Sequence, residues 1–207
     1  MASHEKKKVL SATEQDPAER AAHWELMEAL RAEEPRLIFI DESSINTDLV
    51  RRHGWAPQGE RLHGTIPRNT PLAHSIIGAL APEGLIASME VEGSIDGIAF
   101  AAFIEGVLLP ELRHDDIVLL DNNATHLHRA ALCAIEAAGA FTIFLPAYSP
   151  DFNPIEQCWA KVKGLLRGAA ARTTRALHRA FCKAVAQITP ADAKGWFEYT
   201  GYWVPST

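Results

Sequence analysis

Two aspartates stand where they could do metal-dependent chemistry. Asp41 and Asp121 each follow a short, fully apolar run, Leu37–Ile40 and Ile117–Leu120, which is typical of strands buried on both faces. Catalytic groups of α/β sheets gather outside the carboxyl ends of strands. If the two strands are neighbours, both side chains can face one spot. Two anions so close together repel unless a cation lies between them.

Glu156 could supply a third oxygen ligand from the first turn of a later helix. Ligation by oxygen alone, with room for water, suits Mg²⁺ or Mn²⁺ rather than Zn²⁺. Two such ions, about 3.5–4 Å apart, stabilise the attacking and leaving oxygens of an in-line phosphoryl displacement. These residues therefore indicate the chemistry of a nuclease or a polynucleotidyl transferase.

Each candidate also has a purely structural interpretation. An aspartate after a strand often starts a turn. Asn153 and Glu156 have the spacing of a capping box, with Asn153 as the N-cap and Pro154 at the first helical position. His126 could orient phosphate or a ligand, but a histidine near a helix start is more often a surface or capping group. Spacing alone leaves these alternatives open.

Apolar runs and turn residues predict the elements that must position these side chains. The predicted strands are 37–40, 75–80, 85–91, 117–120 and 141–145. The predicted helices are 16–34, 96–113, 126–138, 154–167 and 174–188. Strands that alternate with helices in this way favour an α/β fold.

The composition is that of one folded domain. The chain has 207 residues, of which 47% are hydrophobic and 22% charged, and these values exclude a disordered or fibrous protein. No apolar stretch is long enough to cross a membrane, and the first residues lack the apolar core of a secretory signal. We therefore expect a cytoplasmic protein without a membrane partner.

The net charge of −6 hides an asymmetry that bears on nucleic-acid binding. Residues 1–156 carry 12 basic and 24 acidic side chains, whereas residues 157–191 carry seven basic ones and no acid. A polyanion could dock on this basic segment, although it could equally form two solvated helix faces. Our candidates for DNA contacts in it are Lys161, Lys163, Arg167, Arg172, Arg175 and Arg179.

Four sequence blocks resemble a known family. They are Phe39-Ile40-Asp41-Glu42-Ser43, Trp55-Ala56-Pro57, Leu119-Leu120-Asp121-Asn122, and the long block from Leu145 to Glu156. Their order, and the 34 residues between Asp121 and Glu156, are similar to the catalytic domain of bacterial insertion-sequence transposases related to the mariner superfamily. The resemblance runs from about Arg36 to Pro190, and its last block is the most specific.

The resemblance implies a ribonuclease H-like fold, with a mixed five-stranded sheet flanked by helices, and DNA cleavage and strand transfer in cut-and-paste transposition. It also implies that Asp41, Asp121 and Glu156 are the catalytic residues and the ligands of two Mg²⁺ ions, for which Mn²⁺ substitutes. Asn122 and His126 match positions beside the metal ligands rather than among them.

The same resemblance suggests how the chain is organised and what it binds. We expect a helical leader or connector at 1–35, the catalytic domain at 36–190 and a C-terminal tail at 191–207. Double-stranded DNA, both transposon ends and target, is the implied substrate, and a second copy of the chain is a possible partner. Relatives read their terminal repeats with helix-turn-helix modules, which the leader is too short to contain, so we expect such a part to be fused or separate.

Three other functions fit parts of the pattern. A transposase remnant could bind DNA or a partner through the basic segment and regulate without catalysis. A phosphoacceptor domain or phosphohydrolase would use a strand-end aspartate with a lysine from another strand end, but no lysine lies between Lys8 and Lys161. A ribonuclease acting on hybrids would share the fold and the metals, but it would not need the block from Tyr148 to Glu156.

Overall fold

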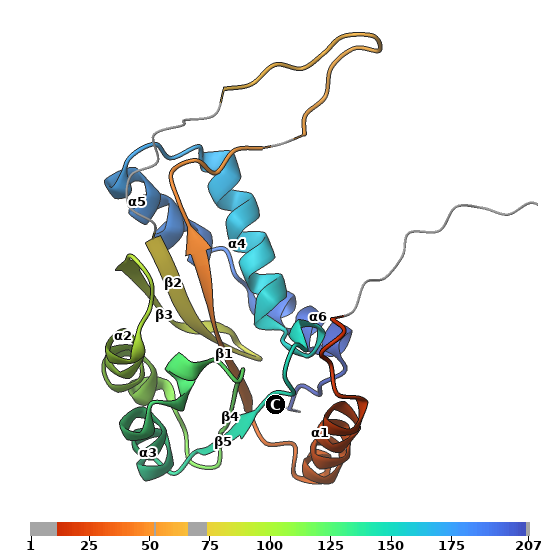
Figure 1. Cartoon of the computed structure of the whole chain (residues 1–207), viewed down its shortest axis with the longest axis vertical. Coiled ribbons are helices and arrows are strands. Elements are labelled where there is room, and N and C mark those ends of the chain that lie inside the picture. Colours follow the sequence, from red (N-terminus) through yellow and green to blue (C-terminus); the bar gives the residue numbers. More distant parts are fainter. Residues whose placement is uncertain (1–11, 52, 66–73, 206–207) are drawn as a thin grey trace, which may run out of the picture.

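The computed structural model describes residues 12–51, 53–65 and 74–205, so the outer parts of the expected leader and tail lie outside the described residues. The strands are β1 (Leu37–Ile45), β2 (His74–Ala81), β3 (Gly84–Glu92), β4 (Ile117–Leu120) and β5 (Phe141–Phe144). The helices are α1 (Pro17–Leu30), α2 (Gly97–Phe103), α3 (Arg129–Ala137), α4 (Ile155–Ala169), α5 (Thr174–Val185) and α6 (Pro190–Thr200). Figure 1 shows their arrangement around one sheet.

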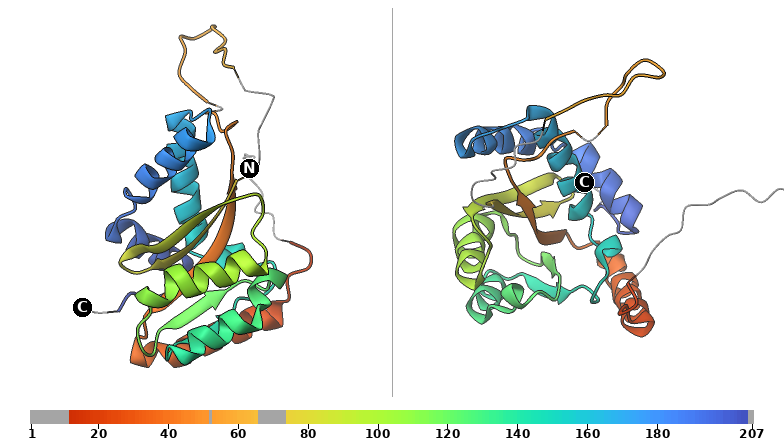
Figure 2. Two further views of the ribbon diagram at one scale, coloured as in Figure 1. Left: turned by 90° about the vertical axis from the view of Figure 1, so that its left-hand side faces the viewer. Right: turned by 45° about the horizontal axis from the view of Figure 1, so that its top comes forward.

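The five strands form a single mixed sheet in the order β3-β2-β1-β4-β5. The first three strands along the chain pair antiparallel, whereas β1 with β4 and β4 with β5 pair parallel. The sheet has helices on both faces (Figure 2). The predicted mixed five-stranded sheet flanked by helices is therefore confirmed.

Side chains of the central strands alternate between two hydrophobic cores. Leu37, Phe39 and Leu119 belong to one core, together with residues of α1, α4, α5 and α6. Ile38 and Leu120 belong to the other, together with residues of α2 and α3. This alternation explains why the apolar runs of β1 and β4 are unbroken, because both faces of these strands are covered.

The expected leader and tail both contain helices that pack on the domain. Met27 of α1 and Phe197 of α6 have exposures of 1% and 0%, and both belong to the core that also contains Phe39. Trp203, beyond α6, is 8% exposed and joins the same core. The described part of 191–207 is therefore a packed helix and its extension rather than a tail.

Two of the predicted helices also differ from the structure in the kind of turn that forms. The predicted helix 96–113 is α2 followed by a π turn over Ile104–Leu108 and a 3₁₀ turn over Leu109–Glu111; Pro110, which has no N–H to donate, lies in this last turn. The predicted helix 126–138 begins only at Arg129, because His128 takes the N-cap position. In the part of the chain that the structure describes, no helix is both long and apolar enough to cross a bilayer.

Candidate active site

Asp41 lies inside β1, opposite Gly78 of β2, and not at the end of the strand as predicted. The parallel pairing of β1 with β4 stops at Phe39 and Leu119, but β1 continues because β2 still pairs with it. Asp121 directly follows β4. Extending the register of β1 and β4 puts Asp121 level with Asp41, and alternation directs the Asp41 side chain toward the face that α4 covers.

Glu156 comes to this face in the first turn of α4. Its backbone N–H donates to the carbonyl oxygen of Asn153 over 3.2 Å, but no side chain caps the helix. The predicted N-cap role of Asn153 is therefore wrong: its Oδ1 is buried, and it has no hydrogen-bond partner among the described residues. The carboxylate of Glu156, which is exposed, is not used in a capping box.

One cavity contains all three carboxylates. It has a volume of about 460 Å³, and Asp41, Asp121 and Glu156 line it. The rest of its wall comes from the loop after β4 and from the loop between β5 and α4. The structure thus brings together side chains that are far apart in the sequence, as the pattern of strands and helix predicted.

Repulsion from neighbouring carboxylates contributes to the raised pKa values of Asp41 and Glu156. Burial, together with the charges of Glu156 and Asp121, raises the pKa of Asp41 to about 7, against a hydrogen bond from the backbone. Partial burial of the Glu156 carboxyl and the charge of Asp121 also raise the pKa of Glu156, although Lys163 opposes this shift. The cavity therefore concentrates negative charge that a cation would stabilise.

His126 connects Asp121 to a second acidic residue. The histidine is 1% exposed, with Nδ1 2.5 Å from Oδ1 of Asp121 and Nε2 3.2 Å from Oε1 of Glu42. Burial lowers the pKa of His126, but hydrogen bonds and charges from Asp121 and Glu42 outweigh it and raise the pKa to about 9. Burial raises the pKa of Asp121, but the hydrogen bond to His126 and its charge outweigh burial and bring this pKa below its ordinary value.

Glu42 is a site residue that we did not predict. It follows Asp41 on β1, so its side chain leaves the opposite face of the strand and meets His126 there. The sequence offered one signal for this role: Glu42 is an acidic residue next to Asp41, and strand alternation sends its side chain to the opposite face. Asn122, which we placed beside the ligands, lines the cavity and donates from Nδ2 to the carbonyl oxygen of Leu145 over 3.1 Å, so it ties the end of β4 to the end of β5.

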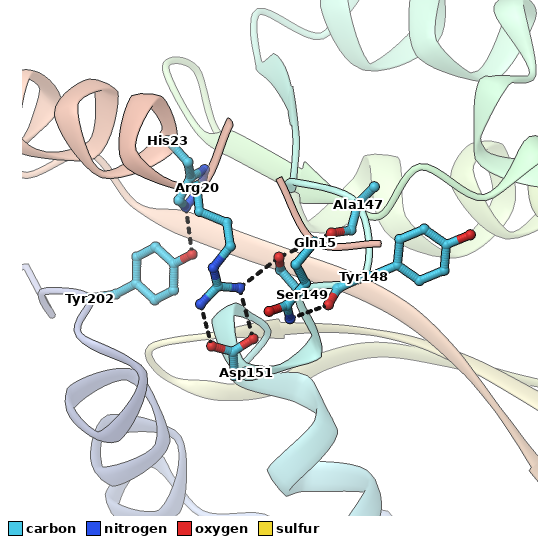
Figure 3. A network of polar contacts seen from close by, with 8 residues as sticks. All are labelled: Gln15, Arg20, His23, Ala147, Tyr148, Ser149, Asp151 and Tyr202. Carbon is cyan, nitrogen blue, oxygen red and sulfur yellow. Dashed lines mark hydrogen bonds and ion pairs between the residues drawn. The ribbon is translucent and has the colours of Figure 1, made fainter. Parts of the chain in front are cut away.

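Helix α1 holds the loop between β5 and α4 from outside (Figure 3). Arg20 donates to Ser149 Oγ over 2.7 Å and to both carboxylate oxygens of Asp151 over 3.0 and 2.7 Å. Its guanidinium lies 3.9 Å from the centroid of the Phe152 ring. Gln15, just before the helix, donates from Nε2 to the carbonyl oxygen of Tyr148 over 2.6 Å.

The donor set of the cavity fits a hard divalent cation. Carboxylate oxygens are the ligands that Mg²⁺ and Mn²⁺ prefer, and the cavity has room for the waters that Mg²⁺ retains. Asp121 directs one oxygen at His126. Within residues 12–51, 53–65 and 74–205, no three acidic, histidine or cysteine side chains are yet placed to bind one ion. Ion binding therefore requires these carboxylates to turn toward one another.

Two of the predicted DNA-binding residues make contacts within the protein. Lys161 Nζ lies 2.5 Å from Oδ2 of Asp192 and 3.0 Å from the carbonyl oxygen of Gln187. Arg172 donates to the carbonyl oxygens of Thr47 and Leu49 over 3.0 and 3.2 Å. These two side chains hold segments of the fold together, which the charge count alone did not indicate.

The other four candidates differ in their relation to the cavity. Lys163 lies on α4 near enough to Glu156 to lower the pKa of that carboxyl. Arg167 is half-buried in the last turn of the same helix. Arg175 and Arg179 are exposed on α5. Lys163 is therefore the basic candidate nearest to the acidic residues, and DNA contact by any of the four stays a prediction.

Comparison with solved structures identifies proteins that share this fold. The chain is similar to the Mos1 mariner transposase in a paired-end complex with Mn, with a TM-score of 0.75, 15% identity and coverage of 97% of this chain and 64% of that chain. It is also similar to the Mos1 strand transfer complex, with a TM-score of 0.71, 16% identity and coverage of 97% and 64%.

The catalytic domain of Mos1 transposase, solved with raltegravir and Mn, gives a TM-score of 0.63 at 13% identity, and the match covers 96% of this chain and 100% of that domain. These likenesses show a ribonuclease H-like fold. The chain spans 64% of the length of the two longer Mos1 chains. No curated protein matches it. A family profile described as DDE superfamily endonuclease matches residues 36–178, so the chain belongs to the DDE superfamily endonuclease family.

Proposed function

We propose that this chain is the catalytic domain of a DDE transposase, which cuts and joins double-stranded DNA in cut-and-paste transposition. The observation that carries the proposal is the cavity of about 460 Å³ lined by Asp41, Asp121 and Glu156. Membership of an endonuclease family supports phosphodiester chemistry. Similarity in fold to Mos1 transposase, which is solved in a strand transfer complex, supports transposition as the purpose of that chemistry.

We propose that the same three carboxylates hold two divalent ions, Mg²⁺ with Mn²⁺ as a substitute. Mos1 paired-end complexes solved with Mn and with Mg support this choice of metals. When bound, the ions supply Lewis acidity for the charge that develops on the phosphate. Burial and mutual repulsion raise the pKa of Asp41 to about 7, which is the electrostatic state expected of ligands without their cation.

The residues of the chain position the reaction. His126 orients Asp121, and Asn122 fixes the loop that carries it. In the cavity a water attacks a phosphodiester of the transposon end, the bond from phosphorus to the 3′-oxygen breaks, and a 3′-hydroxyl is released. That hydroxyl then attacks a target phosphodiester in a second in-line displacement. Neither step forms a covalent bond to the protein.

The match to Mos1 transposase bears on how the transposon ends are recognised. The chain corresponds to 64% of the Mos1 transposase in its paired-end complex. We propose that a helix-turn-helix part, fused or separate, reads the terminal repeats, and that two copies of the chain bring two ends together. Lys163, Arg167, Arg175 and Arg179 are the candidates for contacts to the DNA backbone.

Nicking of short duplexes in Mg²⁺ or Mn²⁺ tests the function. The variants Asp41→Asn, Asp121→Asn and Glu156→Gln should each lose at least about 100-fold of the nicking rate, because even groups around metal ligands are worth about 10–100-fold. Asp115→Asn and Glu136→Gln, which change exposed residues outside the cavity, are matched controls. DNA binding by the wild-type chain without nicking in either metal would instead favour a non-catalytic remnant.

A further inference from the structure

Tyr148 has a conformation and a position that the roles above do not use. Its side chain is 61% exposed, and it lines the same cavity as the three carboxylates. Its φ is 55°, in the left-handed region that is a genuine outlier for a bulky residue. Such outliers persist only where the surrounding structure imposes them, and they cluster at ligand-binding and active sites.

The structure imposes this conformation through contacts from the N-terminal segment. Gln15 bonds the carbonyl oxygen of Tyr148 itself, and Arg20 bonds the side chains of Ser149 and Asp151. Ser149 in turn donates from Oγ to the carbonyl oxygen of Ala147 over 3.2 Å. The residues on both sides of Tyr148 are therefore fixed, while its ring is directed away from this network (Figure 3).

A fixed, exposed aromatic ring beside an acidic cavity suits one kind of ligand surface. The flat face of a nucleobase stacks on an aromatic ring whatever its identity. The carboxylates of the cavity repel a DNA backbone until cations neutralise them, so a contact that does not depend on charge is useful at this wall.

We propose that Tyr148 stacks on a nucleobase next to the phosphodiester that enters the cavity, and that Gln15 and Arg20 are positioning residues that hold it there. The inference rests on the proposed function, because it assumes a DNA strand in the cavity. It adds a contact to a base and a role for the N-terminal segment. Gln15 and Arg20 of this segment contact loop residues that are more than a hundred positions away in the sequence.

Binding of nicked duplexes, each lacking one base at a successive position beside the nick, tests the stack. The measurements use the full chain in Ca²⁺, whose looser coordination disfavours cleavage. At one position the missing base should weaken wild-type binding about 5-fold to about 100-fold. Tyr148→Phe should keep this loss, whereas Tyr148→Ala should bind the intact duplex as weakly as the one with the missing base.

Tyr199→Ala is the matched control, because Tyr199 is 78% exposed on α6 and does not line the cavity. It should reproduce the wild-type pattern. A penalty for the missing base that is the same in wild type and Tyr148→Ala at every position overturns the proposal. So does a Tyr148→Phe variant that behaves like Tyr148→Ala, because the hydroxyl would then make the contact.

A double-mutant cycle tests the positioning role. Arg20→Ala should weaken binding of the intact duplex in the wild-type background and have no effect in the Tyr148→Ala background. Arg31→Ala, which removes an exposed arginine paired with Glu28, should have no effect in either. Additive losses would overturn the positioning role, because Arg20 would then act independently of Tyr148.

Tyr148→Gly separates a structural role from a binding role. Glycine adopts a positive φ without strain, so this variant should melt at a temperature no lower than wild type while losing binding as Tyr148→Ala does. Unchanged binding by Tyr148→Gly overturns the inference. Nicking of the intact duplex is measured in parallel: a Tyr148-dependent binding pattern without nicking refutes the catalytic proposal alone, and nicking without that pattern refutes the stack alone.

Discussion

The loop between β5 and α4 borders two sets of carboxylates in opposite electrostatic states. Asp151 forms an ion pair with Arg20 in which both of its carboxylate oxygens accept hydrogen bonds. Hydrogen bonding to Arg20 lowers the pKa of Asp151, although partial burial opposes this shift. Partial burial and the charge of Glu156 raise the pKa of Asp41, in the cavity, to about 7. The protein itself stabilises the charge of Asp151, whereas it favours the neutral form of Asp41.

This difference separates a carboxylate whose charge an ion pair stabilises from one whose neutral form the fold favours. Strongly perturbed groups that share a cleft are candidates for function, and functional groups often cost the protein stability. The ion pair holds α1 against the loop, and the loop forms a wall of the cavity. The ion pair of Asp151 with Arg20 therefore positions the loop that lines the cavity of Asp41.

The largest expected effect in this comparison comes from removing the cationic partner of Asp121. His126→Gln should slow Mg²⁺-dependent nicking about 10-fold to 100-fold and raise the Mg²⁺ concentration needed for half-maximal rate, because Asp121 loses the group that orients it. The control is His114→Gln, which changes a histidine that is 79% exposed. An unchanged metal requirement in His126→Gln would show that this histidine has no positioning role.

Neutralising Asp41 in the cavity and Asp151 in the ion pair should change the free energy of unfolding in opposite directions. In EDTA at neutral pH, Asp41→Asn should raise the free energy of unfolding by roughly 1–3 kcal/mol, because it removes a buried charge that the fold destabilises. Asp151→Asn should lower it by about 1 kcal/mol, because it weakens a half-exposed ion pair. Urea denaturation measures both, and changes of the same sign would remove the contrast.

His23, beside the Arg20 ion pair, and Asp41, in the cavity, should also make the free energy of unfolding depend on pH in opposite directions. His23, which contacts Tyr202 beside Phe152, has its pKa lowered to about 4 by burial and by the charge of Arg20. Between about pH 4 and 6.5 the unfolded state binds this proton and the folded state does not, so His23 makes stability rise with pH. Asp41 retains its proton in the folded state up to about pH 7, so it makes stability fall as pH rises.

Denaturation from pH 4 to 6.5 in EDTA resolves these slopes. Relative to wild type, Asp41→Asn should show a steeper rise of stability with pH, and His23→Gln a shallower rise or a fall, each by up to about 1.4 kcal/mol per pH unit. Parallel curves for all three proteins would mean that neither group titrates as described.

The smallest effect should distinguish the two lysines of α4. Lys163→Gln should reduce the slope of log binding constant against log salt concentration by about 0.9, the value for one phosphate contact. Lys161→Gln should leave that slope unchanged and lower the melting temperature, because Lys161 is bound to Asp192. Equal slopes in both variants would place Lys163, too, outside the DNA interface.

Local pattern was enough to predict the parts of the site that regular elements position. The two unbroken apolar runs predicted strands buried on both faces, and the structure pairs these strands in parallel, with Asp41 and Asp121 at one level of the sheet. The end of β1 was missed because the residues from Asp41 to Ser44 are polar and only β2 pairs with them. Helix α6 was missed although Thr189 and Asp192 form a capping box with Pro190 at its start.

Contacts between distant segments could not be predicted in this way. Arg20 and Asp151 are 131 residues apart, and no periodicity relates them. The link from Glu42 to His126 spans 84 residues and depends on a 3₁₀ turn, Ala124–Leu127, which overlaps only the first two residues of the predicted helix 126–138. The left-handed backbone of Tyr148 likewise depends on partners that only the folded chain brings near.

The binding of Mn²⁺ to the free chain tests most directly whether Asp41, Asp121 and Glu156 act together as one ion site. Electron paramagnetic resonance of free Mn²⁺ should show saturable binding that Mg²⁺ competes away. Asp41→Asn, Asp121→Asn and Glu156→Gln should each weaken it at least about 10-fold, and Glu136→Gln should not. The same Mn²⁺ affinity in all four variants as in wild type would contradict the account.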